Sequence, residues 1–151
     1  MAETLLQVED LAVHYPVKSG LLVDRTVGYV YAVDDVSLQI ARGETYGLVG
    51  ESGCGKSTLG RAVLRLEKPR RGKIVFDGVD LASMRGEPLR RMRRRMQMVF
   101  QDPLSSLDPR QSVRSLLLEG LQAHGLATGR EATEQRLREL LSAVGLPVSA
   151  L

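Results

Sequence analysis

The sequence contains few of the residues that several protein classes require. Its 151 residues include one cysteine, no tryptophan, four tyrosines and two phenylalanines. A single cysteine excludes an internal disulfide framework and a metal site built from several cysteines. Aromatic residues make up only 4% of the chain, which disfavours the binding of single-stranded nucleic acid by base stacking.

Long apolar runs and a strong charge of one sign are also missing. The longest apolar runs span a few residues, such as Leu116-Leu117-Leu118, whereas a bilayer-spanning helix needs about 20. The first four residues, Met-Ala-Glu-Thr, do not begin the basic and then apolar pattern of a secretory signal. The net charge of +3 does not by itself indicate a nucleic-acid partner. We therefore expect a cytoplasmic protein without direct membrane insertion.

The hydrophobic pattern predicts an α/β fold followed by a helical segment. Alternating or short apolar stretches predict strands at residues 5–15, 29–33, 36–40, 45–49, 73–76 and 98–100. The segment 45–49 is largely apolar, as buried central strands are. After residue 103 the pattern becomes helical and stays so. We therefore expect a mixed α/β domain over residues 1–103 and the beginning of a helical subdomain over residues 104–151.

Helices are predicted where apolar residues recur three and four positions apart. This spacing predicts a helix over residues 59–66, a short basic helix around 89–96 and a longer helix over 113–121. Thr128, with Glu131 three residues later, has the pattern of a capping box. We therefore expect Thr128 to cap a final helix.

Residues 50–57, Gly-Glu-Ser-Gly-Cys-Gly-Lys-Ser, match the phosphate-loop pattern G-x-x-x-x-G-K-[ST] at every fixed position. An apolar segment precedes the motif and an amphipathic helix is predicted after it, which is the context that the motif requires. The glycines allow backbone N–H groups to surround phosphate oxygens, and the N-terminus of the helix adds a positive dipole. We expect Lys56 to contact the β- and γ-phosphates and the Ser57 hydroxyl to bind Mg²⁺. The motif therefore predicts a nucleotide site.

Four segments resemble the ATPase subunit of ABC transporters in their order and spacing. They are Val-Asp-Asp-Val-Ser-Leu-Gln-Ile at 33–40, Gly-Leu-Val-Gly-Glu-Ser-Gly-Cys-Gly-Lys-Ser-Thr at 47–58, Arg-Gly-Lys-Ile-Val-Phe-Asp-Gly at 71–78 and Met-Val-Phe-Gln-Asp-Pro at 98–103. The continuation at 103–110 and the insertion before Val33 resemble the oligopeptide and dipeptide importer branch. The resemblance implies ATP as the nucleotide. It also implies a P-loop NTPase fold with an antiparallel β subdomain and the start of a helical subdomain.

The same resemblance assigns roles to individual residues. Gln101 matches the Q-loop glutamine of the family, which contacts Mg²⁺ and the region of the attacking water. Tyr15 matches the aromatic residue that stacks on adenine, with Tyr29 and Tyr31 as alternatives because the insertion obscures the alignment. The nucleotide contacts expected in the loop are Gly50, Ser52, Gly53, Cys54, Gly55, Lys56, Ser57 and Thr58.

Three motifs of an ABC ATPase are not found in this sequence: the Leu-Ser-Gly-Gly-Gln signature, the second acidic motif with its catalytic glutamate, and the switch histidine. Ile74-Val75-Phe76-Asp77 imitates the acidic motif, but Gly78 follows it. We therefore expect the N-terminal portion of an ATPase subunit, with an incomplete fold. Because it has no general base, it should hydrolyse ATP poorly or not at all.

The resemblance also implies partners for the intact subunit. A member of this family pairs head-to-tail with a second ATPase subunit, identical or homologous. The pair docks on membrane permease subunits at the inner face of the cell membrane. ATP hydrolysis there would power solute import, here of oligopeptides or dipeptides.

An arginine-rich segment carries the main alternative, a non-enzymatic nucleic-acid-binding module. Its members are Arg85, Arg90, Arg91, Arg93, Arg94 and Arg95. No aromatic residues are interleaved with them, and Leu89, Met92 and Met96 form an apolar stripe in the same segment. This combination is typical of a solvated helix face, so we expect no nucleic-acid partner. A small nucleotide kinase is a third interpretation, but its lid arginines and acceptor site are not recognisable.

Overall fold

The computed structural model describes residues 3–19, 25–102 and 107–151. The chain forms two compact units, Met1–Met98 and Val99–Leu151. The division therefore falls at Met98, whereas the change in sequence character predicts a boundary after residue 103.

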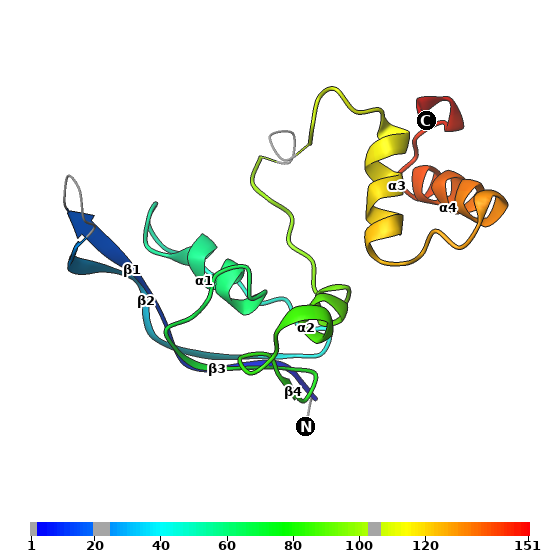
Figure 1. The fold of residues 1–151 in the computed structure, drawn as a ribbon. Helices are drawn as coiled ribbons and strands as arrows, with labels where there is room; N and C mark the ends of the chain where they lie inside the picture. The colour runs from blue at the N-terminus through cyan, green and yellow to red at the C-terminus, as the bar shows by residue number, and fades with distance from the viewer. Residues whose placement is uncertain (1–2, 20–24, 103–106) are drawn as a thin grey trace. The chain divides into compact units, whose positions relative to one another are not determined.

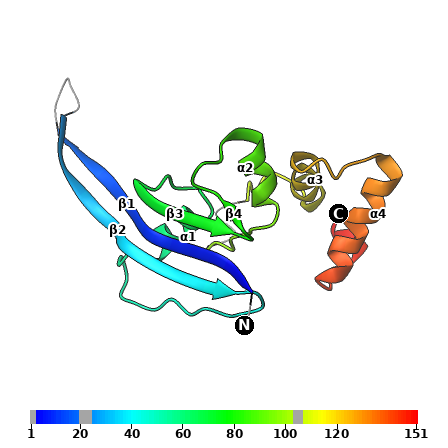
Figure 2. The same cartoon turned by 90° about the horizontal axis from the view of Figure 1, so that it is seen from below.

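The first unit is built on a four-stranded antiparallel sheet with the strand order β2-β1-β3-β4. Its strands are β1 (Thr4–Ser19), β2 (Arg25–Ala41), β3 (Arg71–Phe76) and β4 (Val79–Asp80). Figure 2 shows β1 between β2 and β3, and a two-stranded ribbon of β1 and β2 that continues past β3. Pairing between β1 and β3 ends at Ala12 and Arg71, and none of the described strands pairs with the ribbon beyond them as a third strand.

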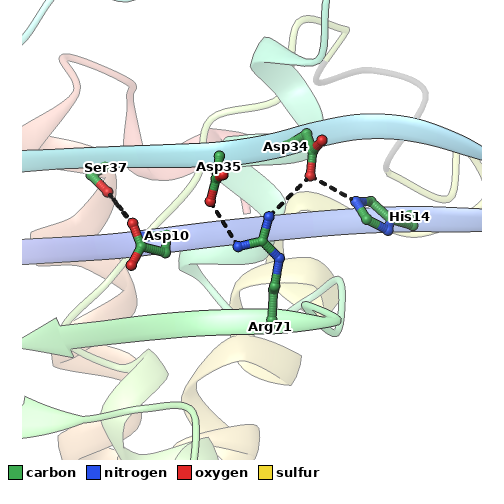
Figure 3. A network of polar contacts seen from close by, with 6 residues as sticks. All are labelled: Asp10, His14, Asp34, Asp35, Ser37 and Arg71. Atoms are coloured by element: carbon green, nitrogen blue, oxygen red, sulfur yellow. Dashed lines mark hydrogen bonds and ion pairs between the residues drawn. The ribbon is translucent and has the colours of Figure 1, made fainter.

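The strands predicted at 29–33 and 36–40 are one continuous strand, β2. The register of the β1–β2 ladder shifts near Asp10 and Asp35, and both aspartates have a left-handed backbone, with φ of 47° and 56°. Aspartate tolerates this conformation better than most residues. The backbone N–H of Asp10 donates to Ser37 Oγ at 2.9 Å, and Ser37 Oγ donates to the Asp10 carboxylate at 3.2 Å (Figure 3). The irregularity bends the ladder without ending the strand.

Helices α1 (Lys56–Val63) and α2 (Gly86–Arg93) lie on the same face of this sheet (Figure 1). They cover a core whose buried members are Val8, Leu11, Val13, Val33, Leu59, Ala62, Ile74, Phe76, Leu81 and Met96. Helix α1 ends earlier than the predicted Leu66, because Arg65 has a left-handed backbone with φ 58°. The short basic helix predicted around 89–96 corresponds to α2, and Met92 packs against the core while Met96 is buried in it.

The predictions of strands at 45–49 and 98–100 are wrong for this structure. Neither segment is in a strand, and Val49 and Val99 are 91% and 90% exposed. A strand needs a neighbour to accept and donate its backbone hydrogen bonds, and an apolar strand also needs cover on both faces. Neither segment pairs with any of the described strands, so neither has the neighbour that a strand requires.

The second unit is helical, with α3 (Val113–Ala123), α4 (Arg130–Ala143) and a 3-10 helix over Val148–Ala150. Leu121, Leu137 and Leu141 are its buried apolar residues. The Arg114 guanidinium donates two hydrogen bonds to the Glu134 carboxylate, which joins α3 to α4 and lowers the pKa of Glu134. Among the helices of the described ranges, none is both long and apolar enough to cross a membrane.

The caps of the second unit differ from the sequence prediction. Ser112 caps α3, and its Oγ accepts a hydrogen bond from the backbone N–H of Ser115 at 3.2 Å. The capping box predicted at Thr128 and Glu131 is wrong, because the cap of α4 is Gly129 and no side chain bonds there. Gly129 has φ 150°, and its carbonyl accepts the first helical hydrogen bond, from Thr133. A shift of one residue is enough to remove Thr128 from the cap position.

Candidate nucleotide-binding site

The glycine-rich loop at residues 50–55 leads directly into α1, which begins at Lys56. Gly55 is the cap residue and has a left-handed backbone with φ 97°, and no side chain caps the helix. No acidic residue lies in the first turn of α1. The first backbone N–H groups of α1 and the positive end of its dipole therefore remain available to an anion.

The closeness of the loop to β2 explains why the motif needs glycine at position 55. A Cβ added to Gly55 would lie 2.0 Å from the carbonyl oxygen of Ala32 and 3.7 Å from Val33 Cγ2. Gly53 also has a left-handed backbone, with φ 81°, but open space surrounds it. The loop thus packs against the middle of β2 at Gly55, and its backbone turns at Gly53.

Lys56 connects the two ends of the loop. Its Nζ donates to the carbonyl oxygens of Gly50 and Glu51 at 2.8 and 2.6 Å, and lies 3.5 Å from Cys54 Sγ. The ammonium charge is therefore held over the backbone of the loop that precedes it. Because these acceptors are neutral, the positive charge of Lys56 is not cancelled by any of these contacts.

A cavity of about 370 Å³ adjoins the loop, which is within the usual range for small-molecule sites. One wall is β2 and the other is the loop with the start of α1. The lining residues are Tyr31, Ala32, Val33, Asp34, Val36, Leu48, Val49, Cys54, Gly55, Lys56 and Leu59. The β2 wall thus combines apolar and aromatic residues with the carboxylate residue Asp34, and Lys56 lies at the other wall.

A network of charged side chains fixes the β2 wall (Figure 3). Asp34 Oδ1 is 3.0 Å from His14 Nε2 on β1 and accepts a 3.4 Å hydrogen bond from Arg71 Nη2. Arg71, at the start of β3, also donates to Asp35 at 2.7 Å, which lowers the pKa of the Asp35 carboxyl. The three strands are therefore tied together beside the cavity. No motif joins His14, Asp34 and Arg71, which lie far apart in the chain, so the sequence does not predict these contacts.

The predicted loop residues are brought together in the first unit. Ser52 and Ser57 are exposed, and Thr58 is half-buried in the first turn of α1. Tyr15 lies on β1 opposite Val30 and does not line the cavity. Gln101 is exposed and belongs to the second unit, so its predicted role stays a prediction.

Two members of the arginine-rich segment, Arg93 and Arg95, bind other parts of the first unit. Arg93 donates to the carbonyl oxygens of Leu64, at 3.0 Å, and Arg65. Arg95 and Arg42 both bind the Asp77 carboxylate, and their hydrogen bonds lower its pKa. These contacts favour a structural role for the two arginines over a nucleic-acid surface.

Comparison with known proteins identifies the family. A family model described as ABC transporter matches residues 33–150. The chain belongs to the ABC transporter family. The matched range contains the loop, α1 and the part of the β2 wall from Val33 onward.

This ABC transporter chain is similar to curated proteins over nearly its whole length. It is 49% identical over 145 residues to the oligopeptide transport ATP-binding protein AppF of Bacillus subtilis, a match covering 95% of this chain and 44% of AppF. It is 48% identical over 145 residues to the glutathione import ATP-binding protein GsiA of Pectobacterium atrosepticum, covering 96% of this chain and 23% of GsiA. The chain therefore spans less than half the length of these relatives.

Solved structures agree with the family assignment. The chain resembles the ATP-binding cassette MJ0796 in its dimeric, post-hydrolysis state bound to ADP and Pi. The TM-score is 0.72 and the identity 25%, over 95% of this ABC transporter chain and 58% of the cassette. The predicted ABC ATPase fold, with an antiparallel β subdomain and helices, is confirmed. The predicted resemblance to peptide-import ATPases is confirmed as well.

Proposed function

We propose that this chain is the ATP-binding part of an ABC importer ATPase and that residues 50–58 bind the phosphates of Mg-ATP. The observation that carries the proposal is Lys56, whose uncancelled charge lies over a glycine loop at the N-terminus of α1. The family match and the relatives named for peptide and glutathione import support the assignment of the nucleotide.

The residues present fit a phosphate chain and a magnesium ion. Gly55 has no Cβ to meet the Ala32 carbonyl oxygen, so the loop can pack against β2 and lead directly into α1, whose first N–H groups can then bind an anion. Lys56 would exchange its bonds to Gly50 and Glu51 for phosphate oxygens. The exposed Ser57 hydroxyl would hold Mg²⁺, which neutralises phosphate charge when bound. Gln101 is proposed as a second contact to Mg²⁺.

Hydrolysis needs more than these residues. The sequence contains neither the signature motif nor the second acidic motif, and the chain spans 44% of AppF. We propose that the catalytic carboxylate is supplied from outside residues 1–151. The chain would then bind ATP but turn it over negligibly, because no general base activates the water.

The proposed partners follow from the relatives. The cassette MJ0796 is dimeric in its solved structures, and AppF and GsiA are named for transport. We propose that the intact subunit pairs with a second ATPase subunit and docks on a permease at the inner face of the cell membrane. Peptide is the proposed solute class, and Tyr15 is the residue proposed to stack on adenine.

Calorimetric titration of Mg-ATP into the chain and its Lys56→Ala variant tests the proposal. We expect Lys56→Ala to remove most of the affinity, because it deletes the charge facing the phosphates. Lys68→Ala is the matched control, because Lys68 is an exposed lysine of the same unit outside the cavity. Equal ATP affinity in wild type and Lys56→Ala would refute the proposed site.

A further inference from the structure

Three arginines in and beside α2 carry charges that the protein itself does not use. Arg85, Arg91 and Arg94 are exposed, and their guanidinium groups form no hydrogen bond or ion pair with any residue in the described ranges. These three residues are called the α2 basic surface. We propose that the α2 basic surface contacts the anionic phospholipid headgroups of a membrane. The proposal uses the proposed function for one point only, the location at the inner face of the cell membrane.

The helical spacing places this surface on the side of α2 that faces away from the core. Met92 packs against the core of the first unit. Arg94, two positions later, lies on the opposite side of the helix, and Arg91 lies about 60° from Arg94 around the axis. Arg85 directly precedes the helix as its N-cap residue. The packing of Met92 therefore holds at least two of the three charges toward the exterior of the first unit.

The acidic residues in contact with the arginine-rich segment leave these charges uncompensated. Glu87 is the only acidic residue of α2, and its carboxylate lies 3.5 Å from the Arg90 guanidinium. Asp77, in the turn between β3 and β4, binds Arg42 and Arg95. Both carboxylates are thus already paired with arginines outside the α2 basic surface.

The chemistry of this surface fits a lipid better than a nucleic acid. Arginine binds phosphate oxygens of either kind with its planar guanidinium. Basic clusters on an amphipathic helix are typical of binding to anionic lipids. No aromatic residue occurs between Arg85 and Arg95 to stack on a base. Because the core occupies Met92 and Met96, the contact would be electrostatic, without insertion of the helix among the acyl chains.

Binding to vesicles tests the proposal. The chain is sedimented with vesicles of phosphatidylcholine alone and of phosphatidylcholine mixed with phosphatidylglycerol. We expect binding to the anionic vesicles only, and its loss at high salt, because salt screens the attraction. Each arginine near an anionic surface contributes about fivefold in affinity, so Arg91→Gln with Arg94→Gln should weaken binding roughly 25-fold. Arg91→Lys with Arg94→Lys should retain most of the affinity. Each single glutamine variant should lose about fivefold, which decides the question if the pair does not fold.

The matched control is Arg25→Gln with Lys73→Gln, which changes the net charge by the same amount. Lys73 precedes the buried Ile74 on β3, so it lies on the face of the sheet opposite the core. Arg25 begins β2 and pairs with Ser19, beyond the end of the pairing between β1 and β3. This control should bind anionic vesicles like wild type.

Three outcomes would overturn the proposal. The first is equal binding of wild type to both kinds of vesicle, or binding to neither. The second is an equal loss in the test pair and the control pair, which would show that net charge alone acts. The third is tighter binding to a DNA duplex than to anionic vesicles, lost in Arg91→Gln with Arg94→Gln, which would identify a nucleic-acid surface.

Titration with Mg-ATP separates this proposal from the proposed function. Neither Arg91 nor Arg94 lines the cavity, so their glutamine variants should bind Mg-ATP like wild type. Lys56→Ala should lose Mg-ATP and still bind anionic vesicles. If wild type binds Mg-ATP and no vesicles, the lipid contact fails and the proposed function stands. If wild type binds anionic vesicles and no Mg-ATP, the proposed function fails, and the arginine variants alone decide the lipid contact.

Discussion

Replacing Gly55 by alanine tests how the loop is held against β2. The added Cβ would lie 2.0 Å from the Ala32 carbonyl oxygen, and φ at this position is +97°. The left-handed backbone alone costs about 1–2 kcal/mol for a residue with a Cβ. Relieving the contact requires a displacement of backbone by about 1 Å, and overpacking of this kind costs about 1–3 kcal/mol more. We therefore expect a loss of about 2–5 kcal/mol in the free energy of unfolding.

The control for this prediction is Gly78→Ala. Gly78 has a similar left-handed backbone, with φ 77°, but no atom lies within 4 Å of an added Cβ. Gly78→Ala should lose only the backbone cost of about 1–2 kcal/mol. Denaturant unfolding measures both variants, and Mg-ATP titration should show lost binding for Gly55→Ala alone. Equal destabilisation of the two variants, with ATP binding retained in both, would show that the loop does not depend on this contact.

Two further predictions concern other parts of the chain. Cys54 is exposed and lines the cavity, so a maleimide should label it and Mg-ATP should slow the labelling. Equal labelling rates with and without saturating Mg-ATP would show that the nucleotide binds elsewhere. Hydrogen bonds from Arg114 lower the pKa of Glu134 in the folded chain. The stability that this pair provides is therefore present above the pKa of Glu134 in the unfolded chain, and it is lost as the pH falls through the pKa of Glu134 in the folded chain. Glu134→Gln should therefore weaken the acid dependence of helix loss, measured by circular dichroism between about pH 6 and pH 2. An unchanged acid transition would refute the role of the pair.

Features fixed by neighbouring residues were predictable from the sequence. The phosphate loop is a contiguous motif, and the spacing of apolar residues predicts the helix over residues 113–121 that α3 forms. The first residue of α4 was not predictable in the same way, because the adjacent residues Thr128 and Gly129 are both of types found at the N-cap position.

Features that depend on distant partners were not predictable. The segment 45–49 has the composition of a buried strand, but no residue pattern shows whether a neighbour will pair with it. The network of His14, Asp34 and Arg71 joins three strands and leaves no periodic signal in the sequence. Among Tyr15, Tyr29 and Tyr31, only the ladder register and the cavity distinguish the rings.

The bonds of Lys56 to the carbonyls of Gly50 and Glu51 have a consequence for the thermodynamics of ligand capture. A freely moving lysine side chain loses about 2 kcal/mol of rotamer entropy when a ligand fixes it. Lys56 has already lost much of that freedom, because the loop's own carbonyls hold its ammonium in place. Capture of an anion then becomes an exchange of neutral acceptors for charged ones, which favours an enthalpy-driven association with little entropic penalty from this side chain.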